Sequence, residues 1–497
     1  MECRDGRRIR VSKRDGQCFF DQLLLPECLR KYMGRPGVGK HELLEVGVSA
    51  EEMRTFLDNG VDPGGDFFWP ISRVWGMGFS WSSYIAQEIL LSVCRASGLS
   101  ESVVLSTDSK SPTDFEEVFG LATDDIMIFS DRGRGATLPA VERLEAAMLA
   151  ANISKHEGKD ITDATDATCV GVDLVDGTHW HPPALRLWQV LCGVLFICRD
   201  RRAAPGCCRA LLGVLQWFDL MQRGNLSMYR EVYEFGRRVP EQTVMNVPQQ
   251  VVRELLCSAI LGIFWPFDMR RPFLGLLGAT DASSTYGFGA AIASMDVEHV
   301  RDIARLDCKI GDHVVLGEGH RPEVDISSRL GRRHHLQIKE SDFRVILSLK
   351  CSDDGHINLK ECRAFLAYLR WVVRSAHRHH HRIFVLLDSR VCLGGLAKGR
   401  SSSWPLNRLL QQAAALTMAC DLVLRLIFVP SAHNPADAPS RGVLKHVSRK
   451  RANSGPRANR LARSLLRHHV WSQLRRSRGS PSSSDTSLSA SFSHLGS

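Results

Sequence analysis

The sequence of 497 residues lacks several features that would place it in a special class of protein. It has no Cys-x-x-Cys pair, and its 15 cysteines are scattered, which argues against a thiolate zinc site and favours a reduced intracellular compartment, cytoplasmic or nuclear. The longest apolar runs, Leu191 to Cys198 and Leu255 to Phe267, are too short to cross a bilayer, so we expect no membrane partner. The start, Met1 to Gly16, is basic and has no apolar stretch, which excludes a secretory signal.

Acidic residues are missing from one long segment, Gly442 to Ser480, which holds 11 Lys or Arg. This segment accounts for the net charge of +10, so the rest of the chain is close to neutral. A basic tail of this kind is drawn to polyanions, including nucleic acid. A merely solubilising extension is the alternative interpretation, and the sequence leaves both open.

The composition is that of a folded protein, and the length suits about three domains. Up to residue 180 the pattern mixes turns with short strand-like runs, at Cys18 to Leu25, Asp124 to Ser130 and Thr168 to Leu174. From Pro182 to Arg238 the apolar spacing is helical, and a connection with one apolar helix, Val251 to Ile263, follows.

From Leu274 onward the pattern predicts a compact α/β order. The expected elements are strands 274–282 and 287–293, helix 358–373, a strand at 383–387 buried on both faces, helix 406–422 and strand 424–429. A run of His and Arg, His377 to Arg382, falls between a helix and a strand. It predicts a solvated basic loop near phosphates rather than a metal site.

Four acids stand where strand or helix ends could bring them together: Asp281, Glu361, Asp388 and Asp437. Each alone is more often a cap or a surface charge. Gathered in a low dielectric, such carboxylates repel one another, and a divalent cation relieves the repulsion. Mg²⁺ prefers oxygen ligands, and two ions roughly 3.5–4 Å apart can serve phosphodiester cleavage. The order therefore predicts a site for two Mg²⁺ ions, with Mn²⁺ as an alternative.

The segments that carry these acids are Thr280-Asp281-Ala282-Ser283, Asn358-Leu359-Lys360-Glu361, Leu387-Asp388-Ser389 and Asn434-Pro435-Ala436-Asp437. Together they resemble the ribonuclease H domain of retroelement polyproteins, gypsy-like and DIRS-like retrotransposons above all. The resemblance implies cleavage of RNA in RNA–DNA hybrids, with all four acids binding metal. The 80 residues from Asp281 to Glu361 exceed the family's spacing, and we expect a lengthened hairpin between Met295 and Lys350.

The first half contains segments in the order of reverse transcriptase motifs: Lys13–Leu23, Trp75–Ser82, Ala122–Ile128, Asn152–Lys159 and Val170–Asp173. They resemble the palm of that family. The resemblance implies that Asp15 and Asp124 bind two Mg²⁺ ions, that Asp125 completes the catalytic set, and that an RNA template, a DNA primer and deoxynucleotides are bound. The residues implied to contact substrate are Phe20, Gln22, Gly78, Phe79 and Lys159.

Two departures weaken the polymerase prediction. Ala122 replaces the usual aromatic residue, and only 14 residues precede Asp15, where the fingers strands are expected. We therefore expect an N-terminally truncated enzyme with weak or absent polymerase activity. A non-catalytic nucleic-acid-binding remnant of a decaying retroelement is the alternative, and a nuclease or transposase of the wider ribonuclease H superfamily is a third.

The sequence thus predicts an α/β protein: an α+β palm, a helical thumb and connection, and a ribonuclease H-like α/β domain. The expected boundaries are 1–180, 181–270 and 271–442, followed by a disordered tail at 443–497. The oligomeric state is left open.

Overall fold

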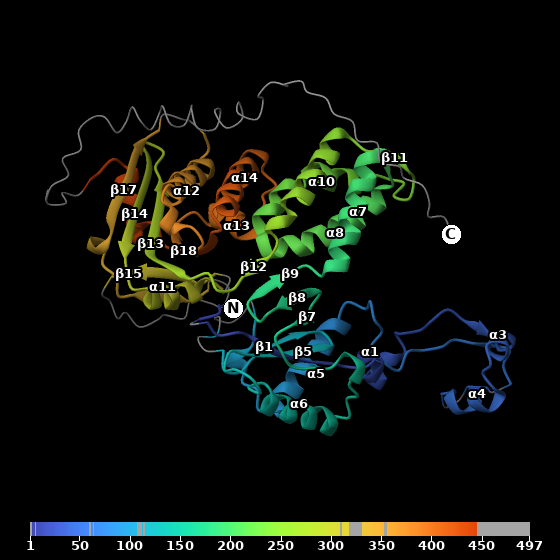
Figure 1. The fold of residues 1–497 in the computed structure, drawn as a ribbon. Helices are drawn as coiled ribbons and strands as arrows, with labels where there is room; N and C mark the ends of the chain where they lie inside the picture. Colours follow the sequence, from blue (N-terminus) through green and yellow to red (C-terminus); the bar gives the residue numbers. More distant parts are fainter. Residues whose placement is uncertain are drawn as a thin grey trace, which may run out of the picture. The chain divides into compact units, whose positions relative to one another are not determined.

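The computed structural model describes residues 2–4, 6–58, 61–62, 64–106, 112, 115–308, 311–317, 331–351 and 355–444. The chain up to Val443 forms one compact unit, and the predicted tail lies outside the described residues from 445 onward. The class is α/β, as predicted (Figure 1). None of the described helices combines the length and the apolarity that a bilayer crossing requires.

The first region contains a four-stranded sheet in the order β4-β5-β1-β6 and a second in the order β12-β9-β8-β7, in which β12 (Phe267–Asp268) comes from a later part of the chain. Its helices are α1 (Phe19–Gln22), α2 (Glu27–Arg30), α3 (Lys40–Glu45), α4 (Ala50–Phe56), α5 (Ser82–Ala96) and α6 (Leu138–Ala150). Its strands are β1 (Arg10–Asp15), β2 (Val38–Gly39), β3 (Phe67–Phe68), β4 (Val118–Ala122), β5 (Asp125–Ser130), β6 (Ile161–Ala164), β7 (Ala167–Cys169), β8 (Val172–Val175) and β9 (His179–His181).

Strand β5 is buried on both faces because its side chains alternate between two cores. Ile126 and Ile128 pack with residues of α5 and α6. Met127 and Phe129 face the other way and pack with Val11 and the second sheet. The continuous apolar run that reads as a strand in the sequence is therefore explained by helices on one side and a sheet on the other.

The prediction of a strand over Cys18 to Leu25 is wrong, because α1 occupies part of this run. Cys18 has a left-handed φ of 45°, which turns the chain away from β1. Phe19 and Leu23 are four residues apart, and both are buried in the core beneath α5. A short apolar run satisfies a helical spacing as readily as a strand spacing, so the sequence alone does not separate the two.

The middle region is helical, as predicted, and has its own core. Its elements are α7 (Ala184–Asp200), β10 (Arg202–Ala203), α8 (Pro205–Asp219), the 3₁₀ segment η3 (Leu220–Met228), α9 (Arg230–Gly236), β11 (Met245–Asn246), α10 (Gln249–Leu261), η4 (Gly262–Phe264) and β12 (Phe267–Asp268). The predicted helix 251–263 corresponds to α10.

A buried carboxylate, Asp219, joins three segments of this helical core. It accepts hydrogen bonds from Asn225 Nδ2 at 3.0 Å, from Trp265 Nε1 at 2.6 Å and from the Tyr229 hydroxyl. Burial raises the pKa of Asp219 to about 6, although these three donors act against the rise. The carboxyl group thus satisfies donors that would otherwise be buried without partners.

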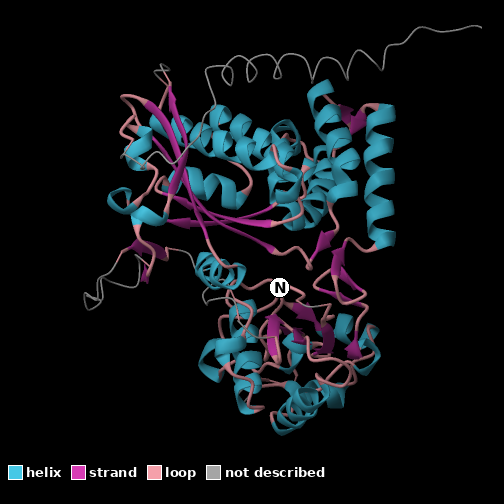
Figure 2. Cartoon of the chain, turned by 60° about the vertical axis from the view of Figure 1, so that its left-hand side comes forward, coloured by secondary structure: helices cyan, strands magenta, loops and turns pink. Residues whose placement is uncertain are grey.

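The last region is built on a seven-stranded sheet in the order β16-β15-β19-β18-β13-β14-β17. Figure 2 shows the strands of the chain in magenta and the helices in cyan. Its strands are β13 (Phe273–Ala282), β14 (Gly287–Ser294), β15 (His313–Leu316), β16 (Arg333–Leu336), β17 (Arg344–Lys350), β18 (Arg382–Leu387) and β19 (Val423–Phe428). Its helices are α11 (Val297–Ala304), α12 (Ile357–Val373), α13 (Arg390–Lys398), α14 (Trp404–Ala419) and α15 (Asp437–Ser440).

The side chains of β14 alternate between the two faces of this sheet, and each face is covered by helices. Ala290 and Ile292 pack in a core with α12, α13 and α14, whereas Ala291 and Ala293 pack in a second core with α11. Both faces are apolar, so β18 is buried along its whole length, as its sequence predicts. Helix α13, which follows Asp388, is an element that the sequence pattern did not reveal.

One prediction for this region holds in part and another is wrong. β17 pairs antiparallel with β14, as in a hairpin with a lengthened connection, but β15 and β16 of that connection pair in parallel and join the other edge of the sheet through β19. Residues 318–330 of the insertion lie outside the described residues. Arg382 is not in a solvated loop but begins β18, where its guanidinium donates to the carbonyls of Met269 and Arg271.

We predict that Asp219→Ala lowers the free energy of unfolding by about 3 kcal/mol, since an unsatisfied buried donor costs about 1–3 kcal/mol. The folded pKa of about 6 exceeds the unfolded value of about 4, so the folded state binds the extra proton. The stability difference between wild type and Asp219→Asn should therefore fall as the pH rises from about 4 to about 6. Denaturation midpoints across this range test the prediction, and a pH-independent difference contradicts it.

Candidate functional site

Two of the predicted acids come from neighbouring parallel strands. β13 pairs in parallel with β18, with Thr280 opposite Leu387. The next residue on each strand is an acid, Asp281 on β13 and Asp388 directly after β18. Because parallel strands end at the same edge of a sheet, the register alone brings these two carboxylates side by side.

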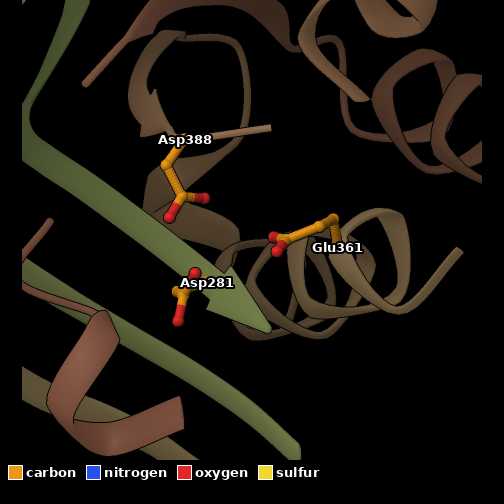
Figure 3. A group of neighbouring side chains, drawn as sticks. All are labelled: Asp281, Glu361 and Asp388. Carbon is orange, nitrogen blue, oxygen red and sulfur yellow. The ribbon is translucent and has the colours of Figure 1, made fainter. Parts of the chain in front are cut away.

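The third acid, Glu361, comes from helix α12, which packs on β13 and β14. Figure 3 shows its carboxylate directed toward Asp281 and Asp388. One ligand oxygen of each residue lies within 4.8 Å of the others. Among the residues that the structure describes, this is the group of His, Cys, Asp or Glu side chains whose geometry could hold a metal ion.

The electrostatics of this triad are unfavourable without a cation. Asp281 and Glu361 are buried, at 4% and 9% exposure. Burial, followed by the charge of Asp388, raises the pKa of Asp281 to about 7. Burial, followed by the charges of Asp388 and Asp281, raises the pKa of Glu361 to about 9. In the metal-free protein Glu361 therefore keeps its proton at neutral pH, and Asp281 is protonated in part.

The triad fits a hard divalent cation. Its donors are all carboxylate oxygens, which Mg²⁺ prefers, and the Oδ1 atom of Asp388 is buried without a hydrogen-bond partner. The neighbouring lysine, Lys360, directs its ammonium group to the carbonyl of Ser284, at 3.5 Å. A cation among the three carboxylates would replace the retained protons and would provide the orphaned oxygen with a partner.

The fourth predicted acid, Asp437, lies outside the triad. It begins α15 and accepts hydrogen bonds from Arg441, with Nε at 3.0 Å and Nη2 at 2.8 Å. Its charge nevertheless contributes to the raised pKa of Asp281. The structure thus gathers three of the four acids, and a ligand role for Asp437 stays a prediction.

Residues without an assigned role in the sequence analysis hold α15 beside the triad. Asn434 donates from Nδ2 to the Thr280 carbonyl at 3.0 Å, next to Asp281. The buried hydroxyl of Ser440 donates to the Asp437 carbonyl at 2.8 Å, and Ser440 also lowers the pKa of Asp281 against the larger effect of burial. A Cβ atom at Gly289 would lie 2.4 Å from the Ala436 carbonyl oxygen, so only glycine permits this approach. The sequence signal that could have identified these residues is the segment Asn434–Arg441, which contains Asp437.

A second acidic group lies in the first region, at the end of β1. Asp15 is opposite Asp125 in the antiparallel pairing of β1 and β5, and Asp124 precedes Asp125 in the hairpin turn. Burial, followed by the charges of Asp15 and Asp125, raises the pKa of Asp124 against a backbone hydrogen bond that lowers it. The sequence prediction that these acids approach one another therefore agrees with the strand pairing.

Lysines neutralise this second group. Lys159 Nζ lies 2.6 Å from Asp15 Oδ2, and Lys13 Nζ lies 3.0 Å from Asp125 Oδ1. The ammonium group of Lys159 therefore pairs with Asp15 in this structure, and contact of Lys159 with substrate stays a prediction. A metal ion is therefore less needed here than at Asp281, Glu361 and Asp388.

The remaining predicted substrate residues lie on the surface or in local contacts. Phe20 is part of α1 and packs partly against the core, and Gln22 binds the backbone of Ser154 through both amide atoms, at 2.8 and 3.1 Å. Gly78 has a φ of +95° with open space around it. Phe79 is 41% exposed and stacks on Trp75. Substrate contact stays a prediction for all of them.

Fold and site together define a class: an α/β protein whose mixed sheet places a buried carboxylate triad at the ends of two parallel strands. Comparison with known proteins adds little to this description of the class. No protein-family model matches the sequence, and no curated protein matches it. Among solved structures, the chain is similar to a foamy viral protease–reverse transcriptase in complex with double-stranded DNA, with a TM-score of 0.36 and 10% identity. The match covers 85% of this chain and 57% of that one.

We predict that the metal-free protein loses stability as the pH rises from about 4 through 7 to about 9, because Asp281 and Glu361 have raised pKa values in the folded state only. Millimolar Mg²⁺ should reduce this loss, since it replaces protons on the carboxylates. Melting temperatures with EDTA or Mg²⁺ across this pH range test the prediction.

The matched controls for this experiment are an Asp281→Asn, Glu361→Gln double variant and Glu88→Gln, an exposed acid on α5. The double variant should lose both the pH dependence and the Mg²⁺ response, whereas Glu88→Gln should retain them. An undiminished Mg²⁺ response in the double variant contradicts the assignment.

Proposed function

We propose that the chain is a metal-dependent nuclease that cleaves the RNA strand of RNA–DNA hybrids at Asp281, Glu361 and Asp388. The observation that carries this proposal is the triad itself: three carboxylates within 4.8 Å, two of them with strongly raised pKa values and one with an orphaned oxygen. Perturbed acids gathered at the carboxyl ends of parallel strands are typical of functional sites.

In this proposal the residues of the site have separate roles. Asp281, Glu361 and Asp388 would hold Mg²⁺, with Asp437 as a further ligand once it leaves Arg441. Bound Mg²⁺ supplies Lewis acidity toward a phosphodiester and a water of lowered pKa. Ser440 and Asn434 would orient Asp281 and the α15 segment, and the arginine released from Asp437 would be available to a phosphate oxygen.

The resemblance of the sequence to retroelement ribonucleases H supports the choice of substrate. The order of the acids along the chain, Asp281, Glu361, Asp388 and Asp437, is the one that the resemblance implies. The elements that carry these acids follow the same order: β13 ends next to Asp281, α12 carries Glu361, β18 ends directly before Asp388, and α15 begins at Asp437.

A second activity, RNA-directed DNA synthesis, is favoured by the pairing of β1 with β5, which places Asp15 opposite Asp125. Against it, Lys159 and Lys13 already neutralise these acids. We therefore propose that nucleotidyl transfer by this chain is the weaker of the two activities. A non-catalytic nucleic-acid-binding role remains the alternative that the experiments below decide.

The nuclease prediction is tested with an RNA–DNA hybrid carrying a labelled RNA strand and Mg²⁺. Asp388→Asn should reduce cleavage by more than about 100-fold, since even residues that only orient metal ligands are worth about 10- to 100-fold. Glu88→Gln is the matched control for a lost surface charge and should cleave normally. Hybrid binding without metal-dependent cleavage in the wild type would instead favour the non-catalytic role.

The polymerase prediction is tested separately by primer extension on an RNA template. The wild type should extend weakly, Asp15→Asn should abolish extension, and Asp388→Asn should leave it unchanged. The reverse pattern is expected for hybrid cleavage, so each variant controls for the folding of the other. Extension that persists in Asp15→Asn would remove Asp15 from the catalytic set.

A further inference from the structure

Two strands, β15 and β16, extend the sheet of the last region beyond β19. His313, the first residue of β15, is in register with Phe428, the last residue of β19, and with Arg333, the first residue of β16. Phe428 is itself in register with Leu387, which directly precedes Asp388 of the triad. Arg333 is therefore level with the triad edge of the sheet and three strand spacings from β18, or roughly 14 Å at about 4.8 Å each.

The side chains of this row face the side of the sheet that α13 covers. Ile427 and Val314 pack in the core with α11, so the residues next to them on their strands, Phe428 and His313, face the other way. Arg333 is in register with His313 and faces the same side. Strand β16 thus adds an arginine to the side of the sheet on which α13 lies.

Helix α13 brings a second arginine to the same row. Arg390, its first residue, has its guanidinium carbon 4.4 Å from the centre of the Phe428 ring. The centre of the His313 ring lies 6.4 Å from the same point. Phe428 and His313 thus connect the two arginines. A guanidinium that stacks on a ring still directs its N–H donors outward in its own plane, where an oxyanion can accept them.

Neither arginine is neutralised by an acid that the structure describes. Arg333 and Arg390 are exposed, and neither forms an ion pair with a described residue. The adjacent acid, Asp312, is buried at 5% exposure and contacts His334 Nε2 at 2.6 Å and the backbone N–H of Arg332 at 2.9 Å. The two guanidinium groups therefore keep a net positive charge on this surface.

The electrostatics of His313 show that both charges act on the same point. Burial lowers the pKa of His313 below its ordinary value, and the positive charges of Arg333, Arg390 and His334 lower it further, against a backbone hydrogen bond with Gly311 that raises it. An oxyanion near His313 would be attracted by both arginines at once.

We propose that Arg333 and Arg390 bind the sugar–phosphate backbone of the hybrid on one side of the phosphate that is cut at the triad. This role rests on the proposed nuclease function, and it gives a purpose to β15 and β16, the strands of the insertion between Asp281 and Glu361. Guanidinium groups bind phosphate oxygens through paired, charge-assisted hydrogen bonds. The roughly 14 Å from β18 to Arg333 corresponds to about four steps of about 3.4 Å along a nucleic-acid strand, so the two contacts would fix the direction in which the duplex leaves the site.

The experiment measures binding of a fluorescent RNA–DNA hybrid to the full chain by polarisation, over a series of salt concentrations, in EDTA so that no metal-dependent cleavage occurs. The test variants are Arg333→Ala and Arg333→Ala with Arg390→Ala. The matched control is Arg230→Ala with Arg374→Ala, which removes two exposed arginines elsewhere. Arg374 follows α12, roughly 20 Å beyond Glu361 at about 1.5 Å per helical residue. The basic segment 442–480 is present in every protein, so its contribution is the same throughout.

The double variant should bind the hybrid about tenfold more weakly than the wild type, with a salt-dependence slope lower by about two, and the single variant should lose about one in slope. The control should lose less than about twofold in affinity. Unchanged binding in the double variant, an equal loss in the control, or a wild type that does not bind the hybrid overturns the proposal.

Failure of the nuclease function would have a different signature, namely no cleavage with Mg²⁺ while the loss of affinity in the double variant persists. Melting temperatures with and without Mg²⁺ verify that each variant is folded and that its triad still responds to the cation.

Discussion

The repulsion among Asp281, Glu361 and Asp388 is the constraint on which the last region of this protein depends. The parallel register of β13 and β18 places two of the carboxylates side by side, and α12 brings the third within 4.8 Å. The fold holds them there although burial and mutual repulsion raise two of their pKa values. Such an arrangement costs stability unless a cation is bound, so it is explained by function rather than by folding.

The surrounding structure makes this arrangement rigid. Two apolar cores cover the two faces of the sheet, and β18 is buried between them along its whole length. The α15 segment closes on β14 only because Gly289 has no side chain, and Asn434 fastens the same segment to the end of β13. A ligand set held on strands and a packed helix keeps its geometry better than one held on loops.

The two acidic groups of the chain are stabilised in different ways, and this difference separates the two proposed activities. At Asp15 and Asp125 the chain supplies its own cations, Lys159 and Lys13. At the triad, no lysine or arginine of the described residues forms an ion pair with a carboxylate, and Arg441 pairs with Asp437 instead. The sequence motifs predict metal binding equally for the two groups. They do so because the sequence does not show whether a lysine from another segment pairs with an acid.

The amino-acid sequence by itself determined the α/β class, the order of the main elements after Leu274 and the residues of the triad, because burial on both faces and acids at strand ends leave a local pattern. The tertiary structure decided the rest. Whether Cys18 to Leu25 turns into a helix, which sheet edge β15 joins and which lysine reaches Asp15 all depend on contacts between distant residues.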